Sequence, residues 1–406
     1  MDQLAPALSR TLPLEGVTVL AVEQYGAGPF GTMLLADLGA DVIKIENPTD
    51  GGEIGRHVGP RMFGPNDSQF YQAFNRNKRS ITLNLKHPEG MALFRQLVAG
   101  ADAVLDNLRG DLPEKLGLDY ASLAATNPAI VCAHLSAYGR DNPRKAWPGY
   151  DYLMQAEAGY CSLTGEPDGP PARFGVSIVD MMTGLMCAFG LVSAVLGARR
   201  TGRGMDVDVS LFDTALHNLS YLATWYLNDG HLQGREPRGA HPSLTPSQMY
   251  RTKDGWLFLM CNKEKFWPVL SERIGRPSWA TDPRYSTFKA RLANREQLTR
   301  DLDEALAART TAEWMAAFGG QVPASPVYDV GQALDNPFVR EGGRVATFTR
   351  PGGGPTLEGL VGPVRIDGRA SPTMAAPALG ADTESVLARI GITPTRIAAL
   401  RADNAL

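Results

Sequence analysis

The stretch Ser177–Arg200, SIVDMMTGLMCAFGLVSAVLGARR, constrains the fold more than any other part of the sequence. It contains one carboxylate, Asp180, and no other charged residue before Arg199. Apolar and small residues fall on every side at helical spacing, as in a helix that its neighbours surround completely. Its length approaches that of a membrane span, but Gly, Ser and Thr interrupt it and its flanks have the pattern of soluble structure. We therefore predict a buried helix and no membrane association.

Asp180 has two interpretations at the start of this helix. In the first, Ser177 is the N-cap and Asp180 lies three residues on, so that each side chain accepts a hydrogen bond from a first-turn backbone N–H. In the second, Asp180 is a catalytic carboxylate that faces a cleft and is kept ionised by the positive end of the helix dipole. The two are compatible, because a first-turn carboxylate can still present an oxygen to a substrate.

Composition narrows the class of protein. The 406 residues have room for two or three domains, and a net charge of −3 gives no reason to expect nucleic acid or an anionic membrane as a partner. The cysteines are far apart and form no CxxC pair, which predicts a reduced, cytoplasmic protein without structural zinc. The N-terminus has no basic region before a long apolar core, so no secretory signal is expected.

Several common catalytic motifs are missing. None of the six histidines has metal-ligand spacing such as HExxH, so we predict no metal site. The sequence has no GxxxxGK[ST] loop and no GxSxG elbow, which argues against a Walker-type NTPase and against a serine hydrolase of the α/β type.

The first 140 residues and the segment after the apolar helix alternate short β-branched runs with helical patterns. Helices are expected at Pro29–Leu38 and Pro88–Val98. Strands are expected at Val17–Val22, Asp41–Ile45, Ser80–Leu85, Ala103–Leu105, Ile130–Leu135 and Asp206–Val209. This alternation predicts an α/β fold with a Rossmann-like, mostly parallel sheet that binds ligands at the carboxyl ends of its strands.

Composition shifts suggest the domain boundaries. Residues 1–227 form the predicted large domain, which ends with a helix over about Leu211–Leu227, and the glycine- and proline-rich residues 228–247 form a linker. Residues 248–333 are a smaller α+β domain that opens with a hairpin around Thr252–Gly255. Residues 334–406 return to the large domain and end in a helix at Thr383–Arg389.

The first predicted turn of the sheet contains Gly26-Ala27-Gly28-Pro29-Phe30-Gly31, a GxGxxG pattern between a strand and a helix. Glu46 closes the second strand, where a dinucleotide-binding domain keeps its ribose-binding acid. The pattern alone indicates a nicotinamide or flavin site, a site for another nucleotide, or only a tight turn.

Polar turns follow or precede the other strands. Residues 75–80 and 106–109, with Lys115, bring amide and cationic groups to the predicted crevice. Residues 136–140, which follow another predicted strand, have the same two interpretations. They are either solvated turns or part of a phosphate-binding site.

The chain resembles the family III coenzyme A transferases, which include formyl-CoA:oxalate and carnitine CoA-transferases and are related to α-methylacyl-CoA racemase. The resemblance runs nearly end to end and rests on short motifs in a fixed order. These are residues 13–17 (PLEGV), 27–29 (AGP), 38–46 (LGADVIKIE), 77–80 (NKRS), 164–165 with 168–171 (TG and DGPP), 180–184 (DMMTG), 201–204 (TGRG) and 379–380 (LG).

The resemblance implies that the glycine pattern is coincidental and that the sheet binds CoA. Asp180 falls at the position of the family nucleophile. Family positions that contact CoA fall on Gly26, Ala27, Phe74, Asn77, Asn107, Lys115, Tyr138 and Gly139. The resemblance further implies an interlocked homodimer and no tightly bound cofactor, because the CoA thioester is itself a substrate.

The expected reaction is transfer of CoA from an acyl-CoA to a carboxylic acid. Asp180 would hold the acyl group as an anhydride and CoA as a thioester, which a carboxylate can do by nucleophilic catalysis. One alternative is a CoA-ester racemase, which needs an acid and a base on opposite faces of the substrate; Tyr150 and Asp151 stand where racemases of this fold keep a histidine and an aspartate. Another alternative is a nicotinamide oxidoreductase.

Two departures from the formyl-CoA enzymes bear on the substrate. Gly26 replaces a glutamine, and residues 239–243 (GAHPS) replace a flexible run of glycines. Both argue against formyl or oxalyl groups and leave a dicarboxylate pair, such as succinyl-CoA with another diacid. Arg173 is a candidate partner for a distal carboxylate or a structural residue.

Overall fold

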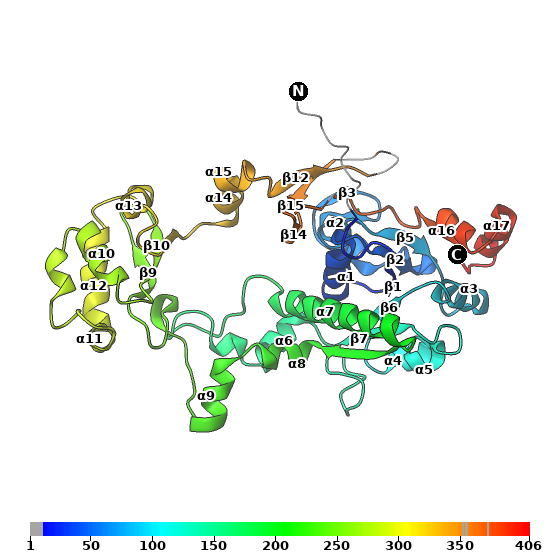
Figure 1. Cartoon of the computed structure of the whole chain (residues 1–406), viewed down its shortest axis with the longest axis horizontal. Helices are drawn as coiled ribbons and strands as arrows, with labels where there is room; N and C mark the ends of the chain where they lie inside the picture. The colour runs from blue at the N-terminus through cyan, green and yellow to red at the C-terminus, as the bar shows by residue number, and fades with distance from the viewer. Residues whose placement is uncertain (1–10, 351–352, 354–355, 372) are drawn as a thin grey trace. The chain divides into compact units, whose positions relative to one another are not determined.

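The computed structural model describes residues 11–350, 353, 356–371 and 373–406, and the chain separates into two compact units (Figure 1). The larger unit contains the residues up to Ala158, Gly175–Ala223 and Gly343–Leu406. The smaller unit contains Gly159–Phe174 and Thr224–Gly342.

A parallel sheet of six strands organises the larger unit, in the order β5-β2-β1-β6-β7-β8. The strands are β1 (Thr18–Val22), β2 (Asp41–Glu46), β5 (Arg79–Thr82), β6 (Ala103–Asp106), β7 (Val131–Ser136) and β8 (Met205–Ser210). The predicted α/β class and parallel sheet are confirmed. The strand order reverses between β1 and β6, so loops leaving these two strands diverge and open a crevice at their carboxyl ends.

Helices cover both faces of this sheet. They are α1 (Ala27–Asp37), α2 (Gln69–Asn75), α3 (Pro88–Val98), α4 (Leu112–Leu116), α5 (Tyr120–Leu123), α6 (Asp151–Glu157), α7 (Ile178–Thr201), α8 (Leu211–His217), α16 (Thr383–Arg389) and α17 (Pro394–Ala402). One core joins β1, β2, β6 and β7 to α3 and to the C-terminal helices, whose Leu387, Ile397 and Leu400 are buried. The C-terminal helices thus pack into the same hydrophobic core as the first strands of the chain.

Helix α7 is the predicted apolar helix, but it is not buried on every side as predicted, because Leu185, Phe189 and Leu196 are exposed. It packs against α1, β7, β8 and α8 (Figure 1). By length and composition α7 alone among the described residues could span a membrane, a test that core helices also pass. Its contact with α1 is backbone to backbone: a Cβ on Gly31 would lie 2.5 Å from the Gly184 oxygen, and a Cβ on Gly184 would lie 2.3 Å from the Ala27 oxygen.

Short elements complete the larger unit. They are β3 (Met62–Gly64), β4 (Asp67–Ser68), β12 (Val345–Phe348), β13 (Leu357–Leu360), β14 (Arg365–Ile366) and β15 (Arg369–Ala370), with 3₁₀ turns η1 (Pro48–Asp50) and η2 (Ile54–His57).

The smaller unit is a three-stranded antiparallel sheet with helices. Its strands are β9 (Ser247–Arg251), β10 (Trp256–Met260) and β11 (Ala324–Pro326), and the β9–β10 hairpin is the predicted one. Its helices are α10 (Phe266–Arg273), α11 (Phe288–Ala293), α12 (Arg295–Leu306), α13 (Thr311–Phe318), α14 (Val330–Asp335) and α15 (Pro337–Arg340), with 3₁₀ turns η3 (Tyr160–Ser162), η4 (Pro237–Gly239) and η5 (Pro277–Ala280). Trp267, Trp314 and Phe318 are buried in its own core.

Two helix predictions need correction. The single helix expected over Leu211–Leu227 is two helices, α8 and α9 (Tyr221–Asp229), because Ser220 adopts φ 52° and ends the helical path. The tail has a second helix, α17, whose N-cap Thr393 accepts a hydrogen bond from the Arg396 N–H and whose first residue is Pro394.

Candidate active site

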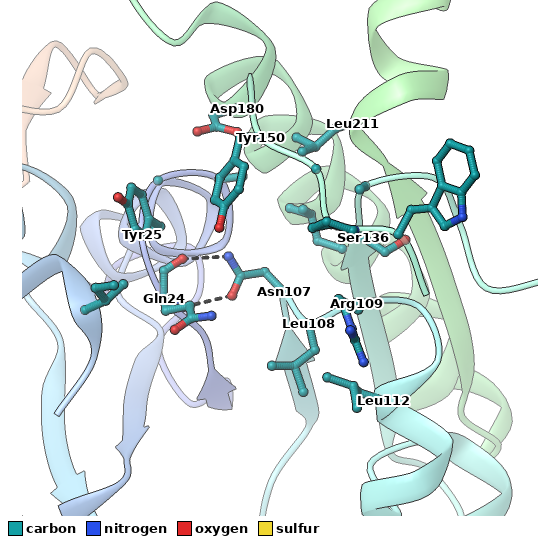
Figure 2. Close-up of a pocket in the computed structure, with 18 residues that line it drawn as sticks. Gln24, Tyr25, Asn107, Leu108, Arg109, Leu112, Ser136, Tyr150, Asp180 and Leu211 are labelled. Carbon is teal, nitrogen blue, oxygen red and sulfur yellow. Dashed lines mark hydrogen bonds between the residues drawn. The ribbon is translucent and has the colours of Figure 1, made fainter. Parts of the chain in front are cut away.

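A pocket of about 380 Å³ opens at the point where the strand order reverses (Figure 2). Gln24 follows β1 and Asn107 follows β6, and two hydrogen bonds join them across the opening. The Gln24 backbone N–H donates to Asn107 Oδ1 at 2.8 Å, and Asn107 Nδ2 donates to the Gln24 backbone carbonyl oxygen at 2.7 Å. The fold therefore places this pocket where doubly wound sheets bind ligands.

Asp180 lines the same pocket, together with Tyr25 and Tyr150 (Figure 2). It is the third residue of α7, so the close packing of α7 on α1 brings it to the turn between β1 and α1. A Cβ on Gly26 would lie 2.7 Å from Asp180 Oδ2, which shows how near the turn comes to the carboxylate. A side chain at this position would move the Asp180 carboxylate from its present place.

The surroundings of Asp180 favour its protonated form. Within the described residues, no protein group donates a hydrogen bond to its carboxylate, and burial raises its pKa to about 7, with a further contribution from the negative charge of Asp151. Asp151 is buried, and its Oδ2 accepts the Asp180 N–H at 3.0 Å while Gln155 Nε2 donates to its Oδ1 at 2.6 Å. Asp180 is thus a carboxylate near the midpoint of its titration at neutral pH.

The capping interpretation of Asp180 is wrong. Ser177, the N-cap residue of α7, makes no side-chain capping hydrogen bond. The donor at Asp180 is satisfied instead by Asp151 of α6, which lies far from it in sequence. A capping group from another element leaves both oxygens of Asp180 free of that task.

The glycine pattern has a structural explanation. Gly26 gives Asp180 room, Gly31 lets α1 touch α7, and a Cβ on Gly28 would lie 3.0 Å from the Asn107 side chain. Glu46, the residue considered for a ribose, is buried; its oxygens accept hydrogen bonds from Arg56, both at 2.7 Å, and from Ser80 at 2.6 Å. Neither observation supports a dinucleotide site.

The residues expected to contact CoA fall in several places. Gly26, Ala27 and Asn107 line the pocket with Asp180. Tyr138 and Gly139 line an adjoining hollow, and the Tyr138 ring lies 6.0 Å from that of Trp147, which belongs to the pocket itself.

The remaining three lie outside the pocket. Lys115 of α4 is exposed and pairs with Asp111 at 2.7 Å. Phe74 faces a different hollow, between α1, α2 and the β12–β13 hairpin. Asn77 holds the C-terminal segment: its Nδ2 donates to Asp37 at 2.8 Å and its Oδ1 accepts the Met374 N–H at 2.7 Å.

Sequence reasoning did not single out several residues of the pocket. Gln24, Tyr25, Ile54, Trp147 and Leu211 line it. The position of Gln24 and Tyr25 directly after the first strand was the available signal, since that is where ligand-binding loops start. Ile54 and Trp147 come from irregular segments whose direction no periodicity reveals.

Comparison with known proteins matches residues 14–383 to CoA-transferase family III. A succinate–glutarate CoA-transferase of Agrobacterium fabrum is 35% identical, with 82% of this chain and 85% of the relative covered. An acetyl-CoA:oxalate CoA-transferase of Acetobacter aceti is also 35% identical, with 83% and 86% covered. The crystal structure of a CAIB/BAIF family protein from Brucella suis superposes with a TM-score of 0.82 and 33% identity, covering 94% of this chain and 100% of that one.

The fold and the site define a doubly wound α/β enzyme with a carboxylate in the crevice where the strand order reverses. The chain belongs to CoA-transferase family III, and it is a CoA-transferase.

Proposed function

We propose that this enzyme transfers CoA from an acyl-CoA to a dicarboxylic acid, with Asp180 as the nucleophile. The observation that carries the proposal is an unpaired, partly buried carboxylate in the pocket at the carboxyl ends of β1 and β6. An ionised carboxylate without hydrogen-bond partners keeps its nucleophilicity, and a raised pKa makes that ionised form more nucleophilic while lowering its population at neutral pH.

The reaction proceeds through two kinds of intermediate. The Asp180 carboxylate attacks the donor thioester, the C–S bond breaks, and an aspartyl anhydride and CoA thiolate form. The thiolate attacks the aspartyl carbonyl, which releases the donor acid and leaves an aspartyl-CoA thioester. The acceptor carboxylate then displaces CoA to give a second anhydride, and the thiolate attacks its acceptor carbonyl, so that Asp180 is regenerated.

The start of α1 is the proposed oxyanion site. No side chain in the described part of the chain caps the start of α1, which leaves its first backbone N–H groups without an intrahelical partner, and Gly26 and Ala27 line the pocket with Asp180. Such amides stabilise the negative charge that develops on each tetrahedral carbonyl oxygen.

The proposed acceptor is a dicarboxylic acid because the two relatives above act on glutarate and on oxalate, according to their names. Gly26 stands where the formyl-CoA enzymes carry a glutamine, which favours an acyl group other than formyl. We propose succinyl-CoA as donor and glutarate as acceptor, with a cytoplasmic location and no membrane partner.

We also propose a homodimer of interlocked chains. Leu185, Phe189 and Leu196 lie on one face of α7 and are 54%, 68% and 69% exposed. An exposed apolar stripe on a central helix is typical of a surface that another chain covers.

Replacing Asp180 by alanine tests the chemistry. Transfer from succinyl-CoA to glutarate should fall at least ~10⁴-fold, because the covalent route is lost, while calorimetry should detect CoA binding as before. Hydroxylamine trapping during turnover, followed by peptide mass mapping, should place the acyl adduct on Asp180. Brisk transfer by the alanine variant, or turnover without an adduct, contradicts the proposal.

A further inference from the structure

Tyr25, in the turn that faces Asp180, has a backbone conformation that tyrosine rarely adopts. Its φ is 68°, in the left-handed region, which bulky residues enter only where the surroundings impose it. The next residue is Gly26, which approaches the Asp180 carboxylate. The conformation of Tyr25 therefore decides where the start of α1 lies relative to Asp180.

The Glu53 carboxylate stabilises this conformation through hydrogen bonds. Its Oε2 accepts the Tyr25 N–H at 2.9 Å, and the same oxygen accepts the Gly55 N–H at 2.9 Å. Its own N–H donates to Glu46 Oε2 at 3.0 Å, so the backbone of Glu53 is tied to the end of β2. The turn is thus anchored to the sheet through one carboxylate.

The site around Glu53 suits a side chain that only accepts hydrogen bonds. Among the described residues, its oxygens contact four donors: two backbone N–H groups, Asn75 Nδ2 at 3.4 Å and Lys44 Nζ at 3.5 Å. The side chain is buried, so water does not replace these contacts. A glutamine in its place would point an NH₂ group at other donors.

We propose that Glu53 is a positioning residue for the transfer reaction: its buried carboxylate fixes the left-handed Tyr25 turn and thereby holds the start of α1 against Asp180. The inference rests on the proposed function of Asp180. Glu53 is not among the residues that line the pocket, so its role does not include contact with the substrate.

The E53Q variant is the main test, with succinyl-CoA and glutarate as the substrates. Its kcat should fall 10–100-fold, because a small displacement of the oxyanion donors affects the transition state most, while KM for succinyl-CoA should change less than about fivefold. D67N is the matched control: Asp67 is a buried carboxylate of the same unit, paired with Arg350 at 2.9 Å and accepting from Gln72, and it has no contact with the turn. Thermal unfolding is measured for both variants.

E53D provides a second variant in case E53Q folds poorly. It keeps an acceptor-only charge next to Lys44 but is one methylene shorter, so it should remain folded and lose roughly 3–30-fold in kcat. A kcat loss in E53Q no larger than in D67N at equal stability, or an E53D enzyme with full kcat, overturns the inference. If the wild type transfers no CoA from succinyl-CoA or acetyl-CoA to glutarate or oxalate, the proposed function fails instead.

Discussion

At the scale of single residues, the site depends on a pair of carboxylates with different tasks. Asp151 accepts the backbone N–H of Asp180, and the proposed mechanism uses the oxygens of Asp180 for the chemistry. Their proximity opposes ionisation of Asp180, whose pKa is raised to about 7 by burial and by Asp151. In the proposed mechanism the same arrangement makes the ionised form of Asp180 a stronger nucleophile.

This pair predicts the pH dependence of transfer. Asp180 must be ionised to attack, so kcat/KM should rise with pH through about 7, and it should fall roughly fivefold between pH 7 and pH 6. The other titratable or charged groups that line the pocket are Tyr25, Tyr150 and Arg109.

The D151N variant should change the pH dependence of kcat/KM. Removing the negative charge lowers the pKa of Asp180, so the acidic limb of kcat/KM should shift to lower pH, and the plateau should decrease because the nucleophile is less basic. Initial rates between pH 5 and pH 9 measure both effects. An unchanged acidic limb would mean that Asp180 does not control it.

At the scale of elements, contact between two helices positions Asp180, the proposed nucleophile. Gly31 of α1 and Gly184 of α7 let the backbones touch, and Asp180 is one turn of α7 away from that contact. The GxGxxG pattern and the apolar helix, which look unrelated in the sequence, therefore serve the same packing. Glycine is required at each contact because only a hydrogen atom fits between the two helix backbones.

The G184A variant should be destabilised by about 2–3 kcal/mol, because its methyl group would overlap the Ala27 oxygen. G197A is the control on the same helix, where a Cβ meets nothing within 4 Å. It should gain about 0.5–1 kcal/mol from the better helix propensity of alanine. Denaturant unfolding of both variants checks the prediction, and equal stabilities would contradict the packing role.

At the scale of the whole molecule, the exposed apolar face of α7 predicts self-association. Light scattering coupled to size exclusion should give the mass of a dimer. The F189D variant should shift it toward monomer or reduce soluble expression, because a charge on a covered apolar surface costs several kcal/mol. K86D, which adds the same side chain at an exposed lysine before α3, should leave the mass unchanged. A monomeric wild type would contradict the dimer.

The sequence by itself determined which elements follow one another along the chain: six strands of a parallel sheet, the helices between them, and an apolar helix that begins with one acid. These features follow from local periodicity and composition, which act over a few residues. It also carried enough short motifs to indicate family III.

Only the tertiary structure decided how the site is assembled. Asp151 accepts a hydrogen bond from the first turn of α7, Gly26 lies close to the Asp180 carboxylate, and Glu53 accepts the Tyr25 N–H. Each of these pairs joins segments that are distant along the chain. Asn77 and Phe74 look equivalent to Asn107 in the sequence but lie elsewhere, because the direction of a side chain depends on the sheet register and on helix packing. Local patterns do not encode that geometry, since long-range contacts fix it only when the chain is folded.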